Sequence, residues 1–453
     1  MARRPPSSKV SRLARLGSLT SKVSTSYLSQ RIAGAFQGDA QREASLRQTH
    51  LRNAERVVST MGTLKGAAMK VGQQLAQVVD GMELPDEVAD VLGRLNDRAE
   101  PVPFDAIRSA VEAELEGALE SRFAEFDEEP LRTPSLAQAH AARLPTGERV
   151  VVKVLHHGIE QSVASDLAAL KTMLVTGRVL RRDRAEIDAI FDEIRDRLTE
   201  ELDYYTEAAN IEYFRKALVG VEGVEVPGTH PAYSTGRVLT MDRLTGAPID
   251  QFLERADDET RLRAGERLVR VFYEMAFRLR TLHADPHAGN YLFRPDGTVG
   301  LLDFGCVKRF DPYWMGRYCN MALAILDDEP EAFFRWSAEV GVLQTDDPDA
   351  RAVLWEISQV VTKPLMVPHY RCGVEGDAVT QEVQRLAPRI LRYRGIRSPR
   401  ELVFLHRALG GTYAMLRKLN HEGNYHALAR PYFEHAVGVA EGRVAEGSPV
   451  LRG

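Results

Sequence analysis

The stretch that decides the fold reads HADPHAGNYLFRPDGTVGLLDFG and runs from His283 to Gly305. Within it, Asp285 is followed five residues later by Asn290, and Asp303 stands thirteen residues beyond Asn290. Two short apolar pieces, around residues 291–293 and 299–302, are expected to be strands because turn residues flank them. The stretch therefore combines two acids and one amide with two short strands, in a part of the chain that otherwise reads as helical.

This spacing is typical of the catalytic and metal-binding loops of kinases. There the first Asp orients or deprotonates a hydroxyl, the Asn holds a magnesium ion, and the Asp of DFG binds magnesium that bridges the phosphates. Asp285 is accordingly a catalytic candidate, and Asn290 and Asp303 are the metal candidates. The competing interpretation is structural, with an Asx turn at Asp285 and a turn glycine at Gly305. DFG alone is weak evidence, but DxxxxN followed closely by LLDFG is far more specific.

A lysine inside an apolar strand is the second candidate. Residues 149–155 read RVVVKVL, and with residues 136–144 they flank a PTGE turn, which predicts two strands joined by a turn. A lone buried charge is very costly. Lys153 therefore either contacts nucleotide phosphates and pairs with a glutamate, as in kinases, or is exposed on an edge strand. With DFG downstream the first interpretation is favoured, and Glu207, on a helix expected over residues 186–218, is the leading partner.

A glycine-containing stretch, GTLKGAAMKVGQQ, covers residues 62–74. It superficially suggests a phosphate loop, but the GxxxxGK[ST] pattern is absent. Lys70, Gly72 and Gln73 lie inside a run, residues 41–80, whose apolar spacing predicts a helix. From periodicity alone the preferred interpretation is close helix packing at Gly72, with Lys70 exposed to solvent.

Composition and charge limit the class of protein. The 44% hydrophobic and 27% charged residues are ordinary for a globular protein, and no apolar stretch reaches about 18 residues. The three cysteines lie far apart with no CxxC pair, which argues against a disulfide framework or a zinc site and favours a reducing, cytoplasmic compartment.

The N-terminal segment has a charge of its own. Residues 1–38 hold seven Lys or Arg and no acid, although the whole chain carries −5. Such a segment can be a solvated arm, a membrane-surface anchor or a transit peptide. The acidic remainder argues against nucleic acid as the main partner, because phosphate binding needs a concentrated basic face.

The order of these motifs resembles the UbiB (AarF/ADCK) family of atypical kinase-like proteins across most of residues 40–430. The segments that carry the resemblance are Lys70 to Gln73 (the family's KxGQ), Ser135 to His140 (its SIAQVH), Lys153, Glu201 to Asp203 (its ExD), Glu207, His283 to Asn290, Asp303 to Gly305, and the HRALGG sequence from His406 to Gly411. KxGQ and ExD are more specific than the motifs that all kinases share.

The resemblance implies an α+β, mostly helical, bilobal protein-kinase-like fold with an N-terminal helical extension that bears KxGQ. The implied parts are a basic segment over residues 1–38, the extension over 39–128, an N-lobe over 129–245 and a helical C-lobe over 246–453. In the family the extension lies over the active site, which disfavours protein substrates. Opposite charges would let Glu201 and Asp203 hold Lys70.

The implied function is an ATP-binding, Mg²⁺-dependent atypical kinase or ATPase that supports isoprenoid quinone or membrane-lipid metabolism. Its catalytic residues would be Asp285, Lys153 and Glu207. The implied partners are a nucleotide, an anionic membrane surface at the inner face of the membrane, and lipid or quinone-biosynthesis proteins. The nucleotide-binding candidates are Lys153, Ser135, Ala137, Gln138, Met241, Asp242, Lys70, Gln73, Glu201 and Asp203.

One loop departs from the family pattern. Where the family has an alanine-rich loop, this chain has Arg132-Thr133-Pro134-Ser135, which removes one backbone N–H and adds a positive charge. The altered loop bears on which nucleotide is preferred and how tightly it binds, beyond the ATP that the resemblance implies. Two alternative functions stay open: a small-molecule phosphotransferase of the aminoglycoside or choline kinase type, which would lack KxGQ and ExD, and a nucleotide-binding scaffold without phosphoryl transfer.

Overall fold

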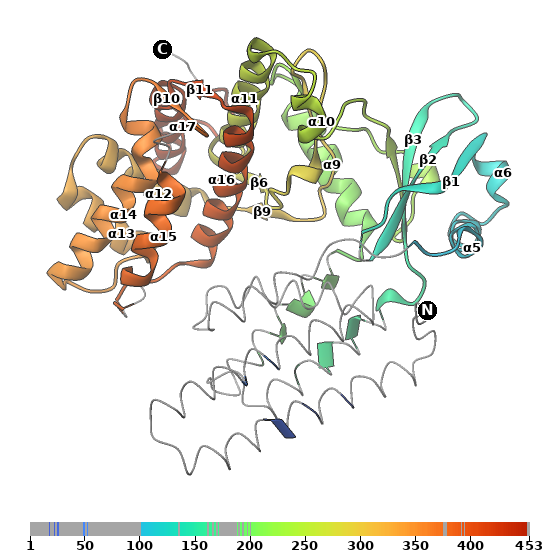
Figure 1. The fold of residues 1–453 in the computed structure, drawn as a ribbon, viewed down its shortest axis with the longest axis horizontal. Coiled ribbons are helices and arrows are strands. Elements are labelled where there is room, and N and C mark those ends of the chain that lie inside the picture. The colour runs from blue at the N-terminus through green and yellow to red at the C-terminus, as the bar shows by residue number, and fades with distance from the viewer. Residues whose placement is uncertain are drawn as a thin grey trace. The chain divides into compact units, whose positions relative to one another are not determined.

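The computed structural model describes residues 101–160 and 201–450, apart from residues 135, 375–377, 391 and 394, together with isolated positions in 18–52 and 163–199. The chain divides into two compact units (Figure 1). The first holds the chain up to Thr206 together with Thr229–Arg243, and the second holds Glu207–Gly228 and Leu244–Gly453. The predicted helix over residues 41–80 and its KxGQ segment lie outside the described residues. The predicted domain boundaries stay predictions.

An antiparallel sheet forms the centre of the first unit. Its strands follow the order β1 (Glu125–Arg132), β2 (Ala137–Arg143), β3 (Arg149–Leu155) and β5 (Val238–Asp242). The two strands predicted around the PTGE turn are confirmed as β2 and β3. Gly147 closes the turn with a φ of 101°, a conformation that glycine adopts without steric cost.

One face of this sheet is packed against two short helices, α5 (Phe104–Glu114) and α6 (Leu119–Arg122) (Figure 1). The β3 residues that face them are at most 1% exposed, because strand side chains alternate between the two faces. The buried cluster on this face comprises Ile107, Val111, Leu115, Leu119, Phe123, Ala142, Leu144, Val150, Val152, Val154 and Val238.

Helix α5 is short and is separate from α6. It stops at Glu114, and Glu116 adopts a φ of 52°, a left-handed conformation that a helix cannot continue through. The Glu112 carboxylate then accepts a hydrogen bond of 3.1 Å from the N–H of Leu119, where α6 begins. Amphipathic spacing alone did not reveal this stop, because both helices bury the same apolar stripe.

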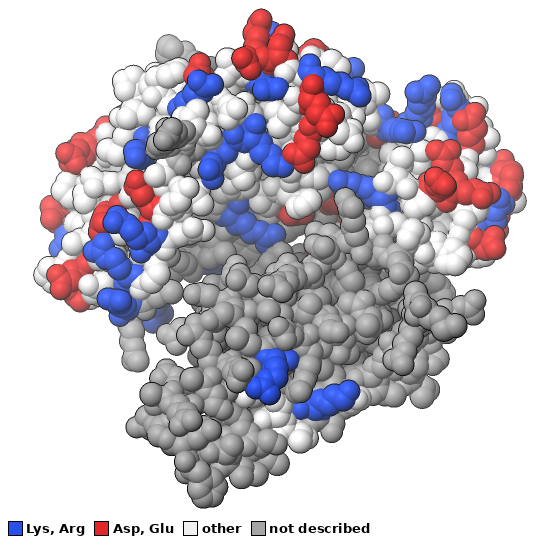
Figure 2. Space-filling view, in the orientation of Figure 1, with Lys and Arg blue, Asp and Glu red and all other residues white. Residues whose placement is uncertain are grey.

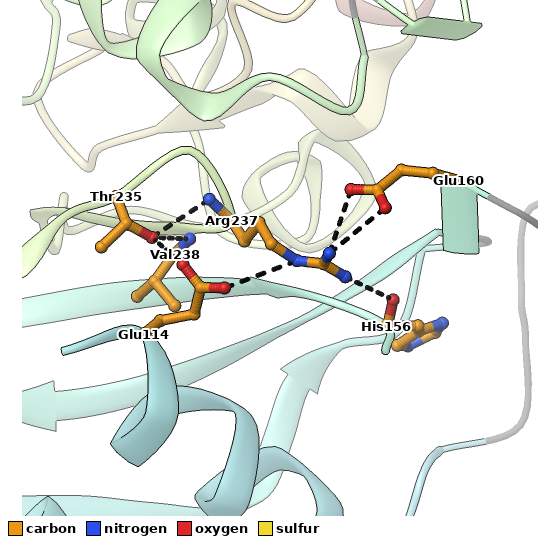
Figure 3. Close-up of polar contacts among 6 residues, drawn as sticks. All are labelled: Glu114, His156, Glu160, Thr235, Arg237 and Val238. Atoms are coloured by element: carbon orange, nitrogen blue, oxygen red, sulfur yellow. Dashed lines mark hydrogen bonds and ion pairs between the residues drawn. The ribbon is translucent and has the colours of Figure 1, made fainter. Parts of the chain in front are cut away.

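A polar network joins α5 to the strands of the first unit (Figure 3). The Arg237 guanidinium lies 3.0 Å from the Glu160 carboxylate and 3.7 Å from that of Glu114. Thr235 Oγ1 accepts hydrogen bonds from the N–H groups of Arg237 and Val238 and donates one to Glu114. These bonds fix the start of β5 beside α5, and therefore fix the register in which β5 pairs with β3.

The outer strand β1 carries acidic side chains. Figure 2 shows red side chains around this edge of the sheet, where Glu125, Asp127, Glu128 and Glu129 are exposed. An exposed edge strand can pair with another chain, and charges together with Pro130 in the strand oppose such pairing.

The second unit is largely helical. The described helices of ten or more residues in it are α11 (Asp258–Tyr273), α12 (Pro312–Leu326), α13 (Pro330–Val340), α14 (Pro348–Met366), α15 (Val379–Ile390), α16 (Arg400–Leu419) and α17 (Tyr425–Ala440), and α9 (Tyr204–Ala217) enters it at Glu207. α12 packs along α13 and α17, and α11 packs on α16. Among the residues that the structure describes, no helix is long and apolar enough to cross a bilayer.

Small sheets complete the second unit. β4 (Val224–Glu225), β8 (Val299–Leu301) and β7 (Tyr291–Phe293) form one sheet, and β6 (Thr281–His283) pairs with β9 (Val307–Arg309) in another. The strands predicted around residues 291–293 and 299–302 are confirmed as β7 and β8. β6 and β9 were not predicted from the sequence, because each is only three residues long and their central residues, Leu282 and Lys308, pair across 26 positions.

The single long helix predicted over residues 186–218 is interrupted. Residues 201 and 202 form a turn, and α9 starts only at Tyr204. Asp203 Oδ1 accepts a hydrogen bond of 3.0 Å from the N–H of Tyr205, and Oδ2 accepts one of 2.8 Å from the Thr206 hydroxyl. Asp203 is thus the N-cap of α9, a position that aspartate favours and that ends the preceding helix.

Candidate active site

A β-hairpin in the second unit brings the two metal candidates to one end. In β7 and β8, Tyr291 pairs with Leu301, and the N–H of Leu302 donates a 3.0 Å hydrogen bond to the Asn290 carbonyl. Asn290 directly precedes Tyr291, and Asp303 directly follows Leu302. The antiparallel register therefore places Asn290 and Asp303 at the same end of the hairpin.

The loop that carries Asp285 is held by its own side chains. The Asn290 amide nitrogen donates hydrogen bonds to the Asp285 carboxylate at 2.8 Å and to the Asp285 carbonyl at 3.3 Å. His287 Nδ1 accepts a hydrogen bond of 3.0 Å from the N–H of Gly289, which caps a short 3₁₀ turn. Because the Asn290 nitrogen faces Asp285, its amide oxygen is directed elsewhere, as a metal ligand requires.

Asp303 is oriented by the backbone that follows it. Its Oδ1 accepts a hydrogen bond of 3.0 Å from the N–H of Gly305, and a carboxylate has further lone pairs with which to bind a cation. Gly305 has no positive φ, so left-handed backbone does not account for this glycine. A Cβ at Gly305 would instead lie 3.3 Å from Asp303 Oδ1.

This donor set fits magnesium. Among the described residues no group of three or more His, Cys, Asp or Glu side chains could hold a metal by itself. Mg²⁺ is usually bound by one or two carboxylates together with phosphate oxygens and water, rather than by a cage of protein ligands. One amide oxygen and one carboxylate at the end of a hairpin therefore suit a metal that arrives with a phosphate compound.

Aromatic packing fixes the backbone between the two motifs. Phe304 is fully buried, and its ring centre lies 5.2 Å from that of Phe214 on α9 and 5.4 Å from that of His283. Burial lowers the pKa of His283, so its ring is neutral and packs as an uncharged group. The side chain of the middle DFG residue thus anchors the loop in the core of the second unit.

Glu207 contacts this same loop. It is 5% exposed on α9, and its Oε1 accepts a hydrogen bond of 3.3 Å from the N–H of Phe304. From the sequence, Glu207 is the leading partner expected for Lys153, on a helix that follows the lysine's strand. Lys153 belongs to the first unit and Glu207 to the second, and their ion pair stays a prediction.

Lys153 lies on a central strand. It pairs with Ala139 of β2 on one side and with Leu239 of β5 on the other. The interpretation of Lys153 as an edge-strand lysine is therefore wrong. Its side chain is half-buried on the face opposite the α5 cluster, because Val152 and Val154, its neighbours in β3, point into that cluster.

Strand register divides the other nucleotide-binding candidates of the first unit. Ala137 pairs with Leu155, and Met241 pairs with Val151, so both lie on the face that carries Lys153. Ala139, which pairs with Lys153 itself, lies there too. The prediction for Ala137 and Met241 is thus compatible with a ligand on the Lys153 face.

Gln138 and Asp242 lie on the opposite face. Gln138 is 1% exposed; its Oε1 accepts a hydrogen bond from the N–H of Val102, and its Nε2 lies 3.3 Å from His140 Nε2. Asp242 Oδ1 lies 2.9 Å from His230 Nε2. Nucleotide binding by these two side chains stays a prediction, and both already hydrogen-bond to residues of the first unit.

His140 explains why Gln138 is held in this way. Its Nδ1 donates a 2.9 Å hydrogen bond to the Asp127 carbonyl, and burial lowers the pKa of the ring. The neutral ring therefore carries its proton on Nδ1, and Nε2 accepts from the Gln138 amide. Of the remaining candidates, Glu201 lies in the turn before α9 and Asp203 caps that helix, whereas Lys70, Gln73 and Ser135 lie outside the described residues.

Three residues near the loops were not named as site residues from the sequence. Arg407 on α16 lies 3.8 Å from the Asp285 carboxylate. Gly411, one turn further along α16, packs so closely that an added Cβ would lie 2.2 Å from Pro286 Cβ. Asn210 on α9 donates to the Phe304 carbonyl. The HRALGG motif was the available signal for the first two, and for Asn210 it was the three-residue spacing from Glu207 on one helix face.

Comparisons with known proteins show which family this chain resembles. The model of the ABC1 atypical kinase-like domain matches residues 94–335. The chain is 31% identical over 340 residues to the atypical kinase COQ8, mitochondrial, of Saccharomyces cerevisiae, covering 75% of this chain and 67% of that protein. It is 29% identical over 381 residues to the probable protein kinase UbiB of Xylella fastidiosa, covering 82% and 67%. The alignments thus span about two thirds of these relatives.

A solved structure supports the fold. The complex of Rv3197 with erythromycin from Mycobacterium tuberculosis matches with a TM-score of 0.61 and 24% identity, covering 86% of this chain and 97% of that one. Together with the domain match, this likeness confirms the predicted α+β, kinase-like fold class.

Proposed function

Because this chain belongs to the ABC1 atypical kinase-like family, we propose that it binds ATP with Mg²⁺ and transfers or hydrolyses the terminal phosphate. Membership confirms the resemblance to UbiB (AarF/ADCK) proteins that the motifs indicated, and it makes the chain a kinase-like enzyme. The observation that carries the proposal is the hairpin end at which Asn290 and Asp303 meet, with Asp285 hydrogen-bonded to Asn290.

Each loop residue has a role in this proposal. Asn290 and Asp303 would hold Mg²⁺, which when bound offsets the negative charge of the phosphates. Asp285 orients the attacking hydroxyl or water and accepts its proton. The Asn290 amide donates a hydrogen bond to the Asp285 carboxylate, and the Arg407 guanidinium lies 3.8 Å from it, so both help to position this side chain.

Lys153 supplies the phosphate contact of the first unit. Its β3 position is fixed by two strand ladders, and small alanines lie beside it at positions 137, 139 and 141 on the same face. These alanines place little side-chain bulk beside the half-buried lysine. The lysine would then contact the phosphates, and Met241 would line the same face.

Turnover is the direct test of this function. The wild-type chain is expected to release phosphate from ATP in the presence of Mg²⁺, and Asp303→Asn is expected to abolish the release. Asp346→Asn, an exposed site in the second unit, is the matched control and should behave as the wild type. Equal turnover in Asp303→Asn and wild type would contradict the metal assignment, and absence of turnover in all three would favour a nucleotide-binding scaffold.

The KxGQ segment would restrict the acceptor. We infer from the family pattern that Lys70 and Gln73 approach Glu201, Asp203 or the nucleotide and occupy the space that a protein substrate needs. The acceptor would then be a small or lipid-linked molecule of isoprenoid quinone or membrane-lipid metabolism, as the names of the COQ8 and UbiB relatives suggest. Lys70→Ala should unmask autophosphorylation without unfolding the chain; identical nucleotide affinity, turnover and autophosphorylation in mutant and parent would contradict this role.

The basic segment would bring the enzyme to a membrane surface. Residues 10–32 can form a helix with leucines near one face and basic residues toward the other. Each basic residue near an anionic leaflet contributes about 1 kcal/mol, so binding should fall with added salt. Co-sedimentation with liposomes that contain anionic lipid tests this, and equal binding after deletion of residues 1–38 would place the membrane contact elsewhere.

A further inference from the structure

We propose that Asn210 is a positioning residue for the metal ligand Asp303 and that it acts through the peptide group between Phe304 and Gly305. This inference rests on the proposed function, in which Asp303 holds Mg²⁺. Asn210 does not contact Asp303 itself in this scheme. It holds the carbonyl of the peptide group whose N–H holds the Asp303 carboxylate.

Two hydrogen bonds at opposite ends of one peptide group form this connection. The Asn210 Nδ2 donates to the Phe304 carbonyl oxygen at 3.1 Å. The N–H of Gly305, which belongs to the same planar peptide group, donates to Asp303 Oδ1 at 3.0 Å. A rotation of this peptide would break both bonds together. The Asn210 amide therefore keeps the Gly305 N–H directed at the carboxylate.

The orientation of the Asn210 amide follows from its two neighbours. Its nitrogen must face the Phe304 carbonyl, because a carbonyl can only accept, and its oxygen faces the Arg309 guanidinium at 3.4 Å, which can only donate. Both partners require the same orientation. Hydrogen bonds in such a chain also polarise one another, so donation to the carbonyl strengthens donation by the N–H of the same peptide.

The surroundings of Asn210 make the bond to Phe304 important. Asn210 is 6% exposed and Phe304 is fully buried, so water cannot easily replace the amide. A buried carbonyl left without its donor is energetically unfavourable. The residue is therefore placed where its loss would disturb the loop rather than be compensated by solvent.

The same helix holds the other side of Phe304. Glu207, one turn before Asn210 on α9, accepts from the Phe304 N–H at 3.3 Å. α9 thus binds both the N–H and the carbonyl of the middle DFG residue. The position of the Asp303 carboxylate is consequently coupled to α9, with Asn210 as the link on the Gly305 side.

Two variants separate the bonds of Asn210. Asn210→Asp has nearly the same shape and can still accept from Arg309, but it cannot donate to the Phe304 carbonyl. Asn210→Leu fills the same buried space and loses both bonds, and it tests the same link if the added charge of Asp prevents folding. Glu212→Gln is the matched control, because Glu212 lies on the same helix in a partly exposed ion pair with Arg215.

The first readout is the exchange of single backbone amides with deuterium in the metal-free chain. The Gly305 amide is expected to exchange about tenfold faster in Asn210→Asp and Asn210→Leu, since loss of one hydrogen bond of about 1.4 kcal/mol corresponds to that factor. The Phe304 amide, which Glu207 holds, is the internal reference and should change much less. A role confined to helix stability would accelerate both amides alike.

The second readout is the gain in affinity for a non-hydrolysable ATP analogue when Mg²⁺ is added. In both Asn210 variants the Mg²⁺-dependent gain in affinity is expected to be about tenfold smaller than in the wild type. Their affinity without Mg²⁺, and all values for Glu212→Gln, are expected to match the wild type. The inference is overturned if the Gly305 exchange and the Mg²⁺-dependent gain are unchanged in both variants. If the wild type shows no such gain, the proposed function fails, and the exchange measurement alone then decides the role of Asn210.

Discussion

The Lys153 face of the first unit and the two loops of the second unit place their functional groups by different means. Lys153 is positioned by backbone ladders, with β2 and β5 on either side and only small or apolar side chains at its paired positions. Asp285, Asn290 and Asp303 are positioned by hydrogen bonds between polar side chains and nearby backbone. The comparison teaches that substitutions beside Lys153 should act through sheet register, whereas substitutions in the loops should act directly on the chemistry.

The first of these predictions concerns Asp285, for which a large loss of turnover is expected. Asp285→Asn should lower turnover by about 10²- to 10⁴-fold, the usual contribution of a general base, because the amide cannot accept the proton. Nucleotide binding should persist, since Asp285 is not a proposed metal ligand. Steady-state turnover and equilibrium binding measured on the same preparation check this split. Lost binding together with surviving turnover would show that the roles of Asp285 and Asp303 are wrongly assigned.

The second prediction compares the two units directly. Lys153→Ala should weaken ATP binding by about tenfold to a hundredfold, the range for a hydrogen bond to a charged group, and should leave the melting temperature nearly unchanged. Glu207→Ala should weaken binding less but destabilise the second unit by about 1–3 kcal/mol, because it leaves the buried Phe304 N–H without its acceptor. Denaturant unfolding and nucleotide titration of both variants test this contrast. It would be contradicted if Glu207→Ala weakened ATP binding more than Lys153→Ala does, or if Lys153→Ala lost more stability than Glu207→Ala does.

The third prediction uses two adjacent glycines on α16. Gly411→Ala should cost about 1–3 kcal/mol and reduce turnover severalfold, because its Cβ would meet Pro286 and displace the Asp285 loop. Gly410→Ala is the matched control: nothing lies within 4 Å of its Cβ, and it should stabilise the helix by up to about 1 kcal/mol. The melting temperature and the turnover of the two variants are measured and compared. Equal behaviour of the two variants would mean that α16 does not support the loop.

The fourth prediction concerns stability in mild acid rather than activity. Burial lowers the pKa of His156 in the first unit, and of His406 and His421 in the second, to about 4. In the unfolded chain these rings titrate near 6.5, so between about pH 6.5 and pH 4 the unfolded state binds more protons. Stability should therefore fall as the pH drops through this window and be insensitive to these groups above it.

A single variant isolates this contribution. His406→Gln should make the melting temperature fall less between pH 7 and pH 5 than it does in the wild type, because one ionisable group has been removed from the unfolded chain. The comparison of slopes cancels the contribution of the carboxylates, which both proteins share. Parallel slopes would show that His406 is not held neutral by burial.

The part of the site that was predictable from sequence is the part whose geometry is local. Asp285 and Asn290 are five residues apart and hydrogen-bond to each other, and Asp303 bonds to a glycine two residues on. The hydrogen bonds that position these three side chains therefore form within short motifs that can be recognised in the sequence. The hairpin that brings Asn290 and Asp303 together was also readable, because β7 and β8 are close in sequence and bounded by turn residues.

The remainder depended on partners distant in the chain. The face on which Gln138 lies is decided by the pairing of β2 with β3, and its amide oxygen accepts a hydrogen bond from the N–H of Val102, 36 residues away. Asn210 meets the Phe304 carbonyl across 94 residues. Similarly, apolar spacing could not show that α5 ends at Glu114. Strand register, hydrogen bonds between distant residues and the ends of helices depend on the folded chain, and no single motif predicts them.

The central claim is that Asp303 and Asn290 in the second unit hold the metal of a nucleotide complex. Calorimetric titration of the wild type and of Asp303→Asn with a non-hydrolysable ATP analogue, with and without Mg²⁺, tests it most directly. The account predicts that added Mg²⁺ strengthens binding to the wild type and that this gain disappears in Asp303→Asn. An equal Mg²⁺-dependent gain in both proteins would contradict it.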